Sequence, residues 1–352
     1  MTYSTKIRNP NWSNARQKAY DVIKKHNIKD FPINIVETIK QYKDVKILTY
    51  KEFSLMRNVT IEDLIKINSS EDGCIHYYAD KDRYLILYND EVNVPERVYW
   101  TLAHEFGHYI LGHHKESERS NLSRLEISDN EYDLYELEAD FFARFLINPP
   151  SIIKEWNVID TNRVMNFFKV SYSAANNTLT YLNKIARSGW TVTAPEDIKK
   201  QLENFIMSVN YGKTCSNCNA FFVYEHSNFC PKCGSSNLNN HERGEDFNMV
   251  YPGIEVDCNS RAKMCPVCNN EELDYNGDYC NVCSSYLINV CASTYDINGF
   301  TGEEYLDKNS CGTLLAGNAR YCHNCGNPSL YLYNKYLNEW NYDPKKILEA
   351  PF

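Results

Sequence analysis

The chain has 352 residues, which is more than one ordinary domain contains, so we expect two or three domains. Its formal net charge of −9 argues against a general phosphate-binding surface. No run approaches the ~18 apolar residues of a membrane span, and the polar N-terminus lacks an apolar signal core. We therefore expect a cytoplasmic protein that has no membrane partner.

The cysteines divide the chain into two parts. Of the 14 cysteines, 13 lie between Cys215 and Cys325, and only Cys74, expected as a buried strand residue, precedes them. In a reducing compartment, densely paired cysteines indicate metal binding more often than disulfide bonds. Residues 1–190 have the composition of one α+β domain, mostly helical with a small β-sheet, and residues 191–210 are predicted as a connector.

Hydrophobic periodicity in the first domain predicts a series of helices and one β-hairpin. The hairpin strands are residues 73–79 and 83–89, both rich in β-forming side chains. Pro95 and Gly112 mark the start and the stop of the most strongly periodic helix. The predicted helices cover residues 15–28, 31–42, 95–112, 132–146, 161–170 and 174–185.

The strongly periodic helix carries the motif His104-Glu105-Phe106-Gly107-His108. Residues four apart lie on one face of a helix, so both imidazoles can bind one metal ion. Glu105 can then deprotonate a water molecule bound to that ion. The apolar side chains lie on the other face, where the helix can pack on a core: Tyr99, Leu102, Ala103, Phe106 and Ile110. The alternative is a pair of surface histidines beside a solvated glutamate.

A catalytic zinc ion needs three protein ligands and an open position for water. The next long helix offers Glu136 and Glu138, which lie about 200° apart around the helix axis, so only one can face the metal. Glu136 shares a face with Ala139, Asp140 and Ala143, and the alanines permit a close approach to the histidine helix. Asp140 is then placed to accept the outer N–H of a ligating histidine. We choose Glu136 as the ligand, with Glu138 as the fallback.

Other polar residues lie near the motif in sequence. His113 and His114 follow the predicted helix stop, so we expect a solvated pair. Tyr109 and His76 are candidates to stabilise an oxyanion, but the sequence positions neither of them.

The segments TLAHEFGHYILGHH and ELEADFFARFLINP resemble the ImmA/IrrE family of zinc metallo-endopeptidases. The family pattern is a Thr-Leu-Ala-His-Glu-aliphatic-Gly-His helix, followed by a Glu-x-x-Ala-(Asn/Asp)-x-Phe-Ala helix. In this chain Phe106 replaces the aliphatic residue, and the closing segment 145–149 is one residue longer. The resemblance covers roughly residues 16–185 and implies a zincin-like peptidase domain.

Carried over residue by residue, the resemblance implies His104, His108 and Glu136 as zinc ligands and Glu105 as the general base and acid. Members of this family are typically intracellular bacterial or mobile-element proteins. Some of them cleave helix-turn-helix repressors and so release a stress or excision programme. The resemblance therefore implies a transcriptional repressor as the leading class of protein substrate.

The cysteine-rich part predicts three zinc ribbons, which are small β-hairpin modules in which two C-x2-C knuckles complete one tetrahedral site. Eleven residues separate the two knuckles in each of the first two ribbons. In the third, Cys322 and Cys325 form a clear second knuckle, and Cys291 and Cys311 must supply the first half across a long insertion. The predicted ligand sets are Cys215, Cys218, Cys230 and Cys233; Cys265, Cys268, Cys280 and Cys283; and Cys291, Cys311, Cys322 and Cys325.

Alternatives remain open for the cysteine-rich part. Cys258 precedes the second ribbon and could replace a ligand there, Cys258 or His323 could join the third site, or the third site could be degenerate. The predicted boundaries are residues 211–240, 258–287 and 288–329 for the three ribbons and residues 330–352 for an aromatic-rich C-terminal segment. We expect this last segment to pack on the rest of the chain, because it is too aromatic for a free tail.

A site closed by four thiolates has no open coordination position, so we expect three structural zinc ions and one catalytic zinc ion. Residues 211–352 contain ten Lys and Arg against seventeen Asp and Glu, a net charge of −7, which disfavours nucleic acid as a partner. We therefore expect a zinc-dependent endopeptidase that hydrolyses an intracellular protein, with ribbons that serve substrate recognition or regulation. The alternative is a non-catalytic zinc-ribbon adaptor or transcription regulator on a peptidase-like scaffold.

Overall fold

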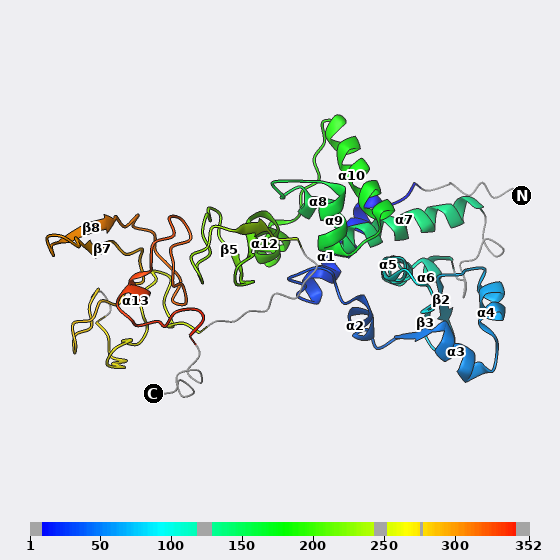
Figure 1. Cartoon of the computed structure of the whole chain (residues 1–352). Coiled ribbons are helices and arrows are strands. Elements are labelled where there is room, and N and C mark those ends of the chain that lie inside the picture. Colours follow the sequence, from blue (N-terminus) through cyan, green and yellow to red (C-terminus); the bar gives the residue numbers. More distant parts are fainter. Residues whose placement is uncertain (1–8, 118–128, 243–251, 275–276, 343–352) are drawn as a thin grey trace, which may run out of the picture. The chain divides into compact units, whose positions relative to one another are not determined.

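The computed structural model describes residues 9–117, 129–242, 252–274 and 277–342. The chain forms two compact units, Met1–Asn210 and Tyr211–Phe352, which are described separately below (Figure 1). Among the described residues, no helix combines the length and the apolar character needed to cross a membrane.

The first unit contains a three-stranded sheet in the order β1-β3-β2. Strands β2 (Gly73–Tyr78) and β3 (Arg83–Tyr88) pair antiparallel, which confirms the predicted hairpin. Strand β1 (Val45–Thr49) was not predicted; it pairs parallel to β3 at one edge. This small sheet, together with the surrounding helices, gives the expected mostly helical α+β fold.

The helices of the first unit are α1 (Trp12–Lys25), α2 (Ile35–Lys40), α3 (Tyr50–Arg57), α4 (Ile61–Asn68), α5 (Pro95–Leu111), α6 (His113–Ser117), α7 (Asp129–Ile147), α8 (Pro150–Ile153), α9 (Thr161–Phe168), α10 (Tyr172–Arg187), α11 (Glu196–Gln201) and α12 (Glu203–Tyr211). The periodic helix begins and ends as predicted, with Pro95 in its first turn and Gly112 in the left-handed conformation (φ +76°) after its last residue. Helices α3 and α4 were not predicted.

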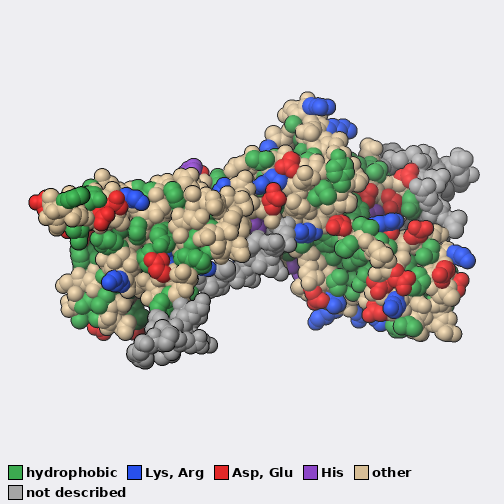
Figure 2. Space-filling view, viewed as in Figure 1, with side chains coloured by type: hydrophobic (Ala, Val, Ile, Leu, Met, Phe, Trp, Pro, Cys, Tyr) green, Lys and Arg blue, Asp and Glu red, His purple; other side chains and the backbone are tan. Residues whose placement is uncertain are grey.

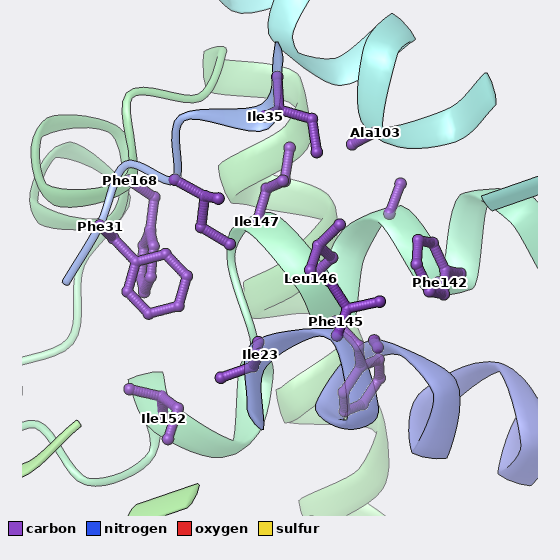
Figure 3. Packing of buried hydrophobic residues seen from close by; sticks show 14 of the residues in the cluster. Ile23, Phe31, Ile35, Ala103, Phe142, Phe145, Leu146, Ile147, Ile152 and Phe168 are labelled. Atoms are coloured by element: carbon purple, nitrogen blue, oxygen red, sulfur yellow. The ribbon is translucent and has the colours of Figure 1, made fainter. Parts of the chain in front are cut away.

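The core of this unit is formed where α1, α5, α7 and α9 bury their apolar sides together. Ile23 of α1, Ala103 of α5 and Phe142 of α7 are fully buried in it (Figure 3). Helices α5 and α7 approach closely at Gly107, where an added Cβ atom would lie 3.2 Å from the carbonyl oxygen of Ala139. The close approach expected from the alanines of α7 is therefore present, and it brings the two helices that carry the predicted metal ligands together.

The segment predicted as a connector, residues 191–210, is instead a packed part of the first unit. It forms α11 and α12, and Ile198, Leu202 and Phe205 are buried in the same core as α1 and α9. These apolar residues follow a helical spacing, so they form one face that the core covers. The boundary between the units falls after Asn210.

The second unit has little regular structure. Among the described residues, this unit contains one helix of its own, α13 (Leu330–Tyr333). Its strands are β4 (Gly212–Cys215), β5 (Phe221–Val223), β6 (Leu238–Asn240), β7 (Thr294–Ile297) and β8 (Glu304–Lys308). The first three strands form an antiparallel sheet in the order β5-β4-β6, and β7 and β8 form a separate hairpin. Short isolated bridges connect the remaining loops.

The C-terminal aromatic segment packs on the second unit as expected, over the residues that the structure describes. Tyr331 is fully buried beside Cys265 and Cys280, and its hydroxyl donates to the carbonyl oxygen of Leu287. Trp340 packs against the first cysteine cluster, with the ammonium of Lys232 5.6 Å from its ring centre.

The β7–β8 hairpin lies between Cys291 and Cys311 and is mostly exposed to solvent. Phe300 at its turn is fully exposed, and Tyr295 and Ile297 are more than half exposed. Hydrophobic and acidic side chains both appear on the surface over this hairpin (Figure 2). The hairpin is therefore the long insertion predicted within the third ribbon, and it contributes no buried core of its own.

The first and third ribbons are joined by backbone hydrogen bonds. The carbonyl oxygen of His323 accepts from the amides of Asn228 and Phe229, and the carbonyl oxygen of Pro231 accepts from the amides of Arg320 and Tyr321. The His323 ring also stacks on Tyr224, with ring centres 4.1 Å apart.

Candidate metal centres

Three side chains converge between α5 and α7 in the first unit. The Nε2 atoms of His104 and His108 lie 3.1 Å apart, and the Glu136 carboxylate approaches them at 3.2 and 3.5 Å. Two ring nitrogens and a carboxylate bound tetrahedrally to one zinc ion would be separated by about 3.3 Å. The donor set and its spacing therefore fit a zinc ion.

The Asp140 carboxylate orients one of these histidines. Its Oδ1 atom lies 2.9 Å from Nδ1 of His104, so the ring donates its Nδ1–H to Asp140 and its Nε2 atom faces Glu136. Glu136 and Asp140 lie one turn apart on α7, which is why a single helix supplies both carboxylates. The structure thus places Asp140 where the sequence predicted it.

Mutual contacts determine the protonation of this group. Burial disfavours charge on His104, but its contacts with Asp140 and Glu136 outweigh burial and raise the pKa of His104 well above its usual value. Burial also opposes ionisation of Glu136, but hydrogen bonds to His104 and His108 outweigh it and lower the pKa of Glu136. Burial lowers the pKa of His108, which keeps its ring neutral and able to bind a cation.

Glu105 follows the first histidine on α5 and lies within the electrostatic range of the other three side chains. Burial raises its pKa, and the neighbouring histidines oppose that rise only in part. Burial is the main cause that raises the pKa of Tyr50 and the pKa of Cys74. The nearby charge of Glu105 contributes to both increases. Neither residue was predicted to lie near the site.

The prediction for His113 and His114 was wrong, because both rings are fully buried. Gly112 ends α5, and α6 begins at once and turns the two side chains back into the unit. Nδ1 of His113 lies 2.9 Å from Nδ1 of His108, and Nε2 of His114 lies 3.3 Å from the carbonyl oxygen of Ile75.

Glu138, the fallback ligand, lies outside the converging group. Its side chain is buried, and Oε2 lies 3.1 Å from Nε2 of His113. The two candidates for an oxyanion contact are engaged elsewhere: the Tyr109 hydroxyl donates to the Asp44 carboxylate, and Nε2 of His76 lies 2.9 Å from Oδ1 of Asn68.

A groove of about 930 Å³ adjoins the group at Asp140. Its walls include the half-exposed Trp12 and the largely exposed Trp190, and three of its lining residues are basic: Arg16, Arg144 and Lys184. The groove has room for several side chains of a polypeptide.

The second unit gathers its cysteines into three groups of four. Their paired Sγ atoms lie 3.4 to 3.6 Å apart, and within each group all Sγ atoms lie within 4.8 Å of one another. Four thiolates around one zinc ion would be about 3.8 Å apart, whereas a disulfide bond is about 2.05 Å long. The groups are Cys215, Cys218, Cys230 and Cys233; Cys265, Cys268, Cys280 and Cys283; and Cys291, Cys311, Cys322 and Cys325.

The residues considered as alternative ligands lie outside these groups. Cys258 is exposed and belongs to none of the three groups, and Cys74 is a buried residue of β2, as expected. His323 stacks on Tyr224 instead of facing the third group. In the described residues, the three groups of four cysteines and the group formed by His104, His108 and Glu136 therefore suggest zinc as the cofactor.

Residues 59–180 match the family model Peptidase_M78, described as the IrrE N-terminal-like domain. This match confirms the predicted resemblance over that part of the chain, and it includes the whole His104–Glu136 group. The search of curated proteins found no match. The match and the converging side chains together support a metallopeptidase-like function for the first unit.

Proposed function

Because residues 59–180 resemble the IrrE N-terminal-like peptidases, we propose that the chain is a zinc-dependent endopeptidase that hydrolyses an intracellular protein. The leading substrate class is a helix-turn-helix transcriptional repressor. The observation that carries the proposal is the convergence of His104, His108 and Glu136, with Glu105 beside them. This is the ligand set and the acid–base group that metal-assisted peptide hydrolysis requires.

A zinc ion bound there would polarise the peptide carbonyl and acidify a water molecule. Glu105 would accept a proton from that water as the water oxygen attacks the carbonyl carbon, and it would deliver the proton to the amine nitrogen as the C–N bond breaks. Burial raises the pKa of Glu105, and a base with a raised pKa holds the transferred proton more readily before releasing it. Asp140 fixes the ring of His104, and the same residue lines the neighbouring groove, which has room for a polypeptide segment.

The ribbons serve substrate recognition or regulation in this proposal. Four thiolates leave no open coordination position, so the three groups have a structural role. The net charge of −7 over residues 211–352 disfavours nucleic acid and favours a protein partner. The exposed apolar side chains of the β7–β8 hairpin are suited to contact a protein.

The test compares the wild type with Glu105→Gln in cells that also express the genes adjacent to the gene for this chain, whose products are the candidate substrates. New protein N-termini, identified by mass spectrometry, should appear with the wild type and be absent with Glu105→Gln, while both proteins bind the same amount of zinc. Glu96→Gln, in the first turn of the same helix, is the charge-matched control and should cleave normally.

Two results would count against the proposal. Undiminished cleavage by Glu105→Gln would remove Glu105 from the mechanism. Absence of new N-termini with the wild type, combined with stable binding of a partner by both proteins, would favour the non-catalytic adaptor.

A further inference from the structure

His113 and Glu138 form a buried pair behind the proposed metal group, and the mechanism above uses neither of them. His113 has no exposed surface, and Glu138 is 3% exposed. The ring of Tyr135 stacks on His113 with centres 4.6 Å apart, and the Asn11 amide donates to the second carboxylate oxygen of Glu138. Packing and hydrogen bonds therefore hold both side chains in place.

The pair is connected to a predicted metal ligand by two short contacts. Nδ1 of His108 lies 2.9 Å from Nδ1 of His113, and Nε2 of His113 lies 3.1 Å from Oε2 of Glu138. Because two ring nitrogens face each other at 2.9 Å, one of them must carry a proton and the other must accept it.

The carboxylate decides which nitrogen carries that proton. A carboxylate only accepts, so Glu138 draws the proton of a neutral His113 ring onto Nε2 and leaves Nδ1 as an acceptor. His108 must then carry its own proton on Nδ1, and its Nε2 lone pair faces Glu136 and His104. A metal ligand needs this tautomer.

The two histidines of the motif are thus oriented by different means. A half-exposed carboxylate, Asp140, contacts His104 directly, whereas a second histidine separates His108 from its carboxylate, Glu138. His114 is buried beside the same rings, but its Nε2 lies 3.3 Å from the backbone carbonyl oxygen of Ile75. His114 therefore provides a matched control.

The geometry points to His113 and Glu138 as positioning residues that fix the tautomer and orientation of His108 for metal binding. The inference rests on the zinc group of the proposed function, but it does not depend on peptidase activity. Removing such a partner of a ligating histidine typically weakens metal binding about 10- to 100-fold.

The experiment measures zinc affinity of the full chain by competition with a chelator, with His104→Ala as the reference for the ribbon-bound zinc. His113→Phe keeps the stacked ring but removes the acceptor, and it should weaken zinc binding at the first-unit site about 10- to 100-fold. His114→Phe should stay within about threefold of the wild type. Glu138→Leu should resemble His113→Phe, and Glu138→Gln, which keeps an accepting oxygen, should recover most of the affinity.

Nitrogen-15 NMR of histidine provides a readout that a purely structural role would not change. With the first-unit site emptied and the ribbon zinc retained, His108 should carry its proton on Nδ1, and His113→Phe should shift His108 toward the other tautomer. Equal zinc affinities for His113→Phe and His114→Phe would overturn the inference. If His113→Phe fails to fold, equal affinities for Glu138→Leu and Glu138→Gln would overturn it, while the Glu105→Gln test of peptidase activity would be unaffected.

Discussion

The two units hold their predicted metal ligands in opposite ways. In the first, a continuous core of apolar side chains packs α5 against α7, and the ligands project from these helices. In the second, the apolar clusters are small, and the cysteines are themselves members of them: Cys215, Cys218 and Cys230 in the first ribbon, Cys265 and Cys280 in the second, and Cys291 and Cys322 in the third.

This difference corresponds to the two roles that a zinc ion has in proteins, catalytic and structural. A fold that is stable through its own core can present three ligands and leave a coordination position open for chemistry. A segment with little core needs the metal to complete its fold, and four thiolates close the site. The first unit is therefore organised around a site that can be open, and the second around sites that are closed.

Metal removal should give the largest contrast between the units. Apparent binding free energies of structural zinc are about 10–16 kcal/mol at neutral pH, so a strong chelator should unfold the ribbons. Amides of residues 211–242 should lose protection from hydrogen exchange, while those of α1, α5 and α7 should keep most of theirs. Parallel loss of protection in both units would contradict the contrast.

A change at the closest contact of α5 and α7 should have an intermediate effect. The added Cβ of Gly107→Ala would lie 3.0 Å from Cδ1 of Phe142 and 3.2 Å from the carbonyl oxygen of Ala139. Overpacking costs about 1–3 kcal/mol, and the helix preference of alanine offsets about 1 kcal/mol of this. We expect a net loss of about 1 kcal/mol in the free energy of unfolding of the first unit.

The same substitution should also weaken zinc binding. The added methyl group would push α7 away from α5, and Glu136 would move away from the two histidines with it. Denaturant unfolding and chelator competition measure the two effects. Unchanged zinc affinity together with normal stability would show that the close approach of the helices does not position the ligands.

The smallest effect is expected at the exposed hairpin of the second unit. Phe300 is fully exposed, so Phe300→Ser should change the stability of the zinc-loaded chain by about 0.5 kcal/mol or less. Leu287→Ala, at a fully buried position of the same unit, should cost about 2–5 kcal/mol. Thermal unfolding of the two variants measures the difference, and a large loss with Phe300→Ser would assign the hairpin a structural role.

Strong local signals made much of the first unit predictable from sequence. Pro95 and Gly112 bound a long periodic helix, and a spacing of four places His104 and His108 on one face of it. The structure brings Glu136 to these histidines, and the role of the three residues as ligands remains a prediction. The β2–β3 hairpin was predictable because both strands are rich in β-forming residues.

The remaining features depend on contacts that sequence patterns do not encode. Strand β1 and helices α3 and α4 are only five to eight residues long, too short for a clear periodicity. The burial of His113 depends on α6 restarting directly after Gly112, and a polar residue after a helix stop otherwise indicates solvent. The apolar spacing of Ile198, Leu202 and Phe205 was visible, but the polar residues between them favoured a connector.

The shared backbone bonds of the first and third ribbons make the zinc-binding modules interdependent. Residues 228–231 of one ribbon are joined to Arg320, Tyr321 and His323 of the other, so each ribbon supplies part of the other's fold. A cell that loads zinc into only one of these sites would obtain an incompletely folded pair. Occupancy of the two sites should therefore rise together as zinc becomes plentiful, and this pair of ribbons should bind zinc cooperatively instead of as two independent sites.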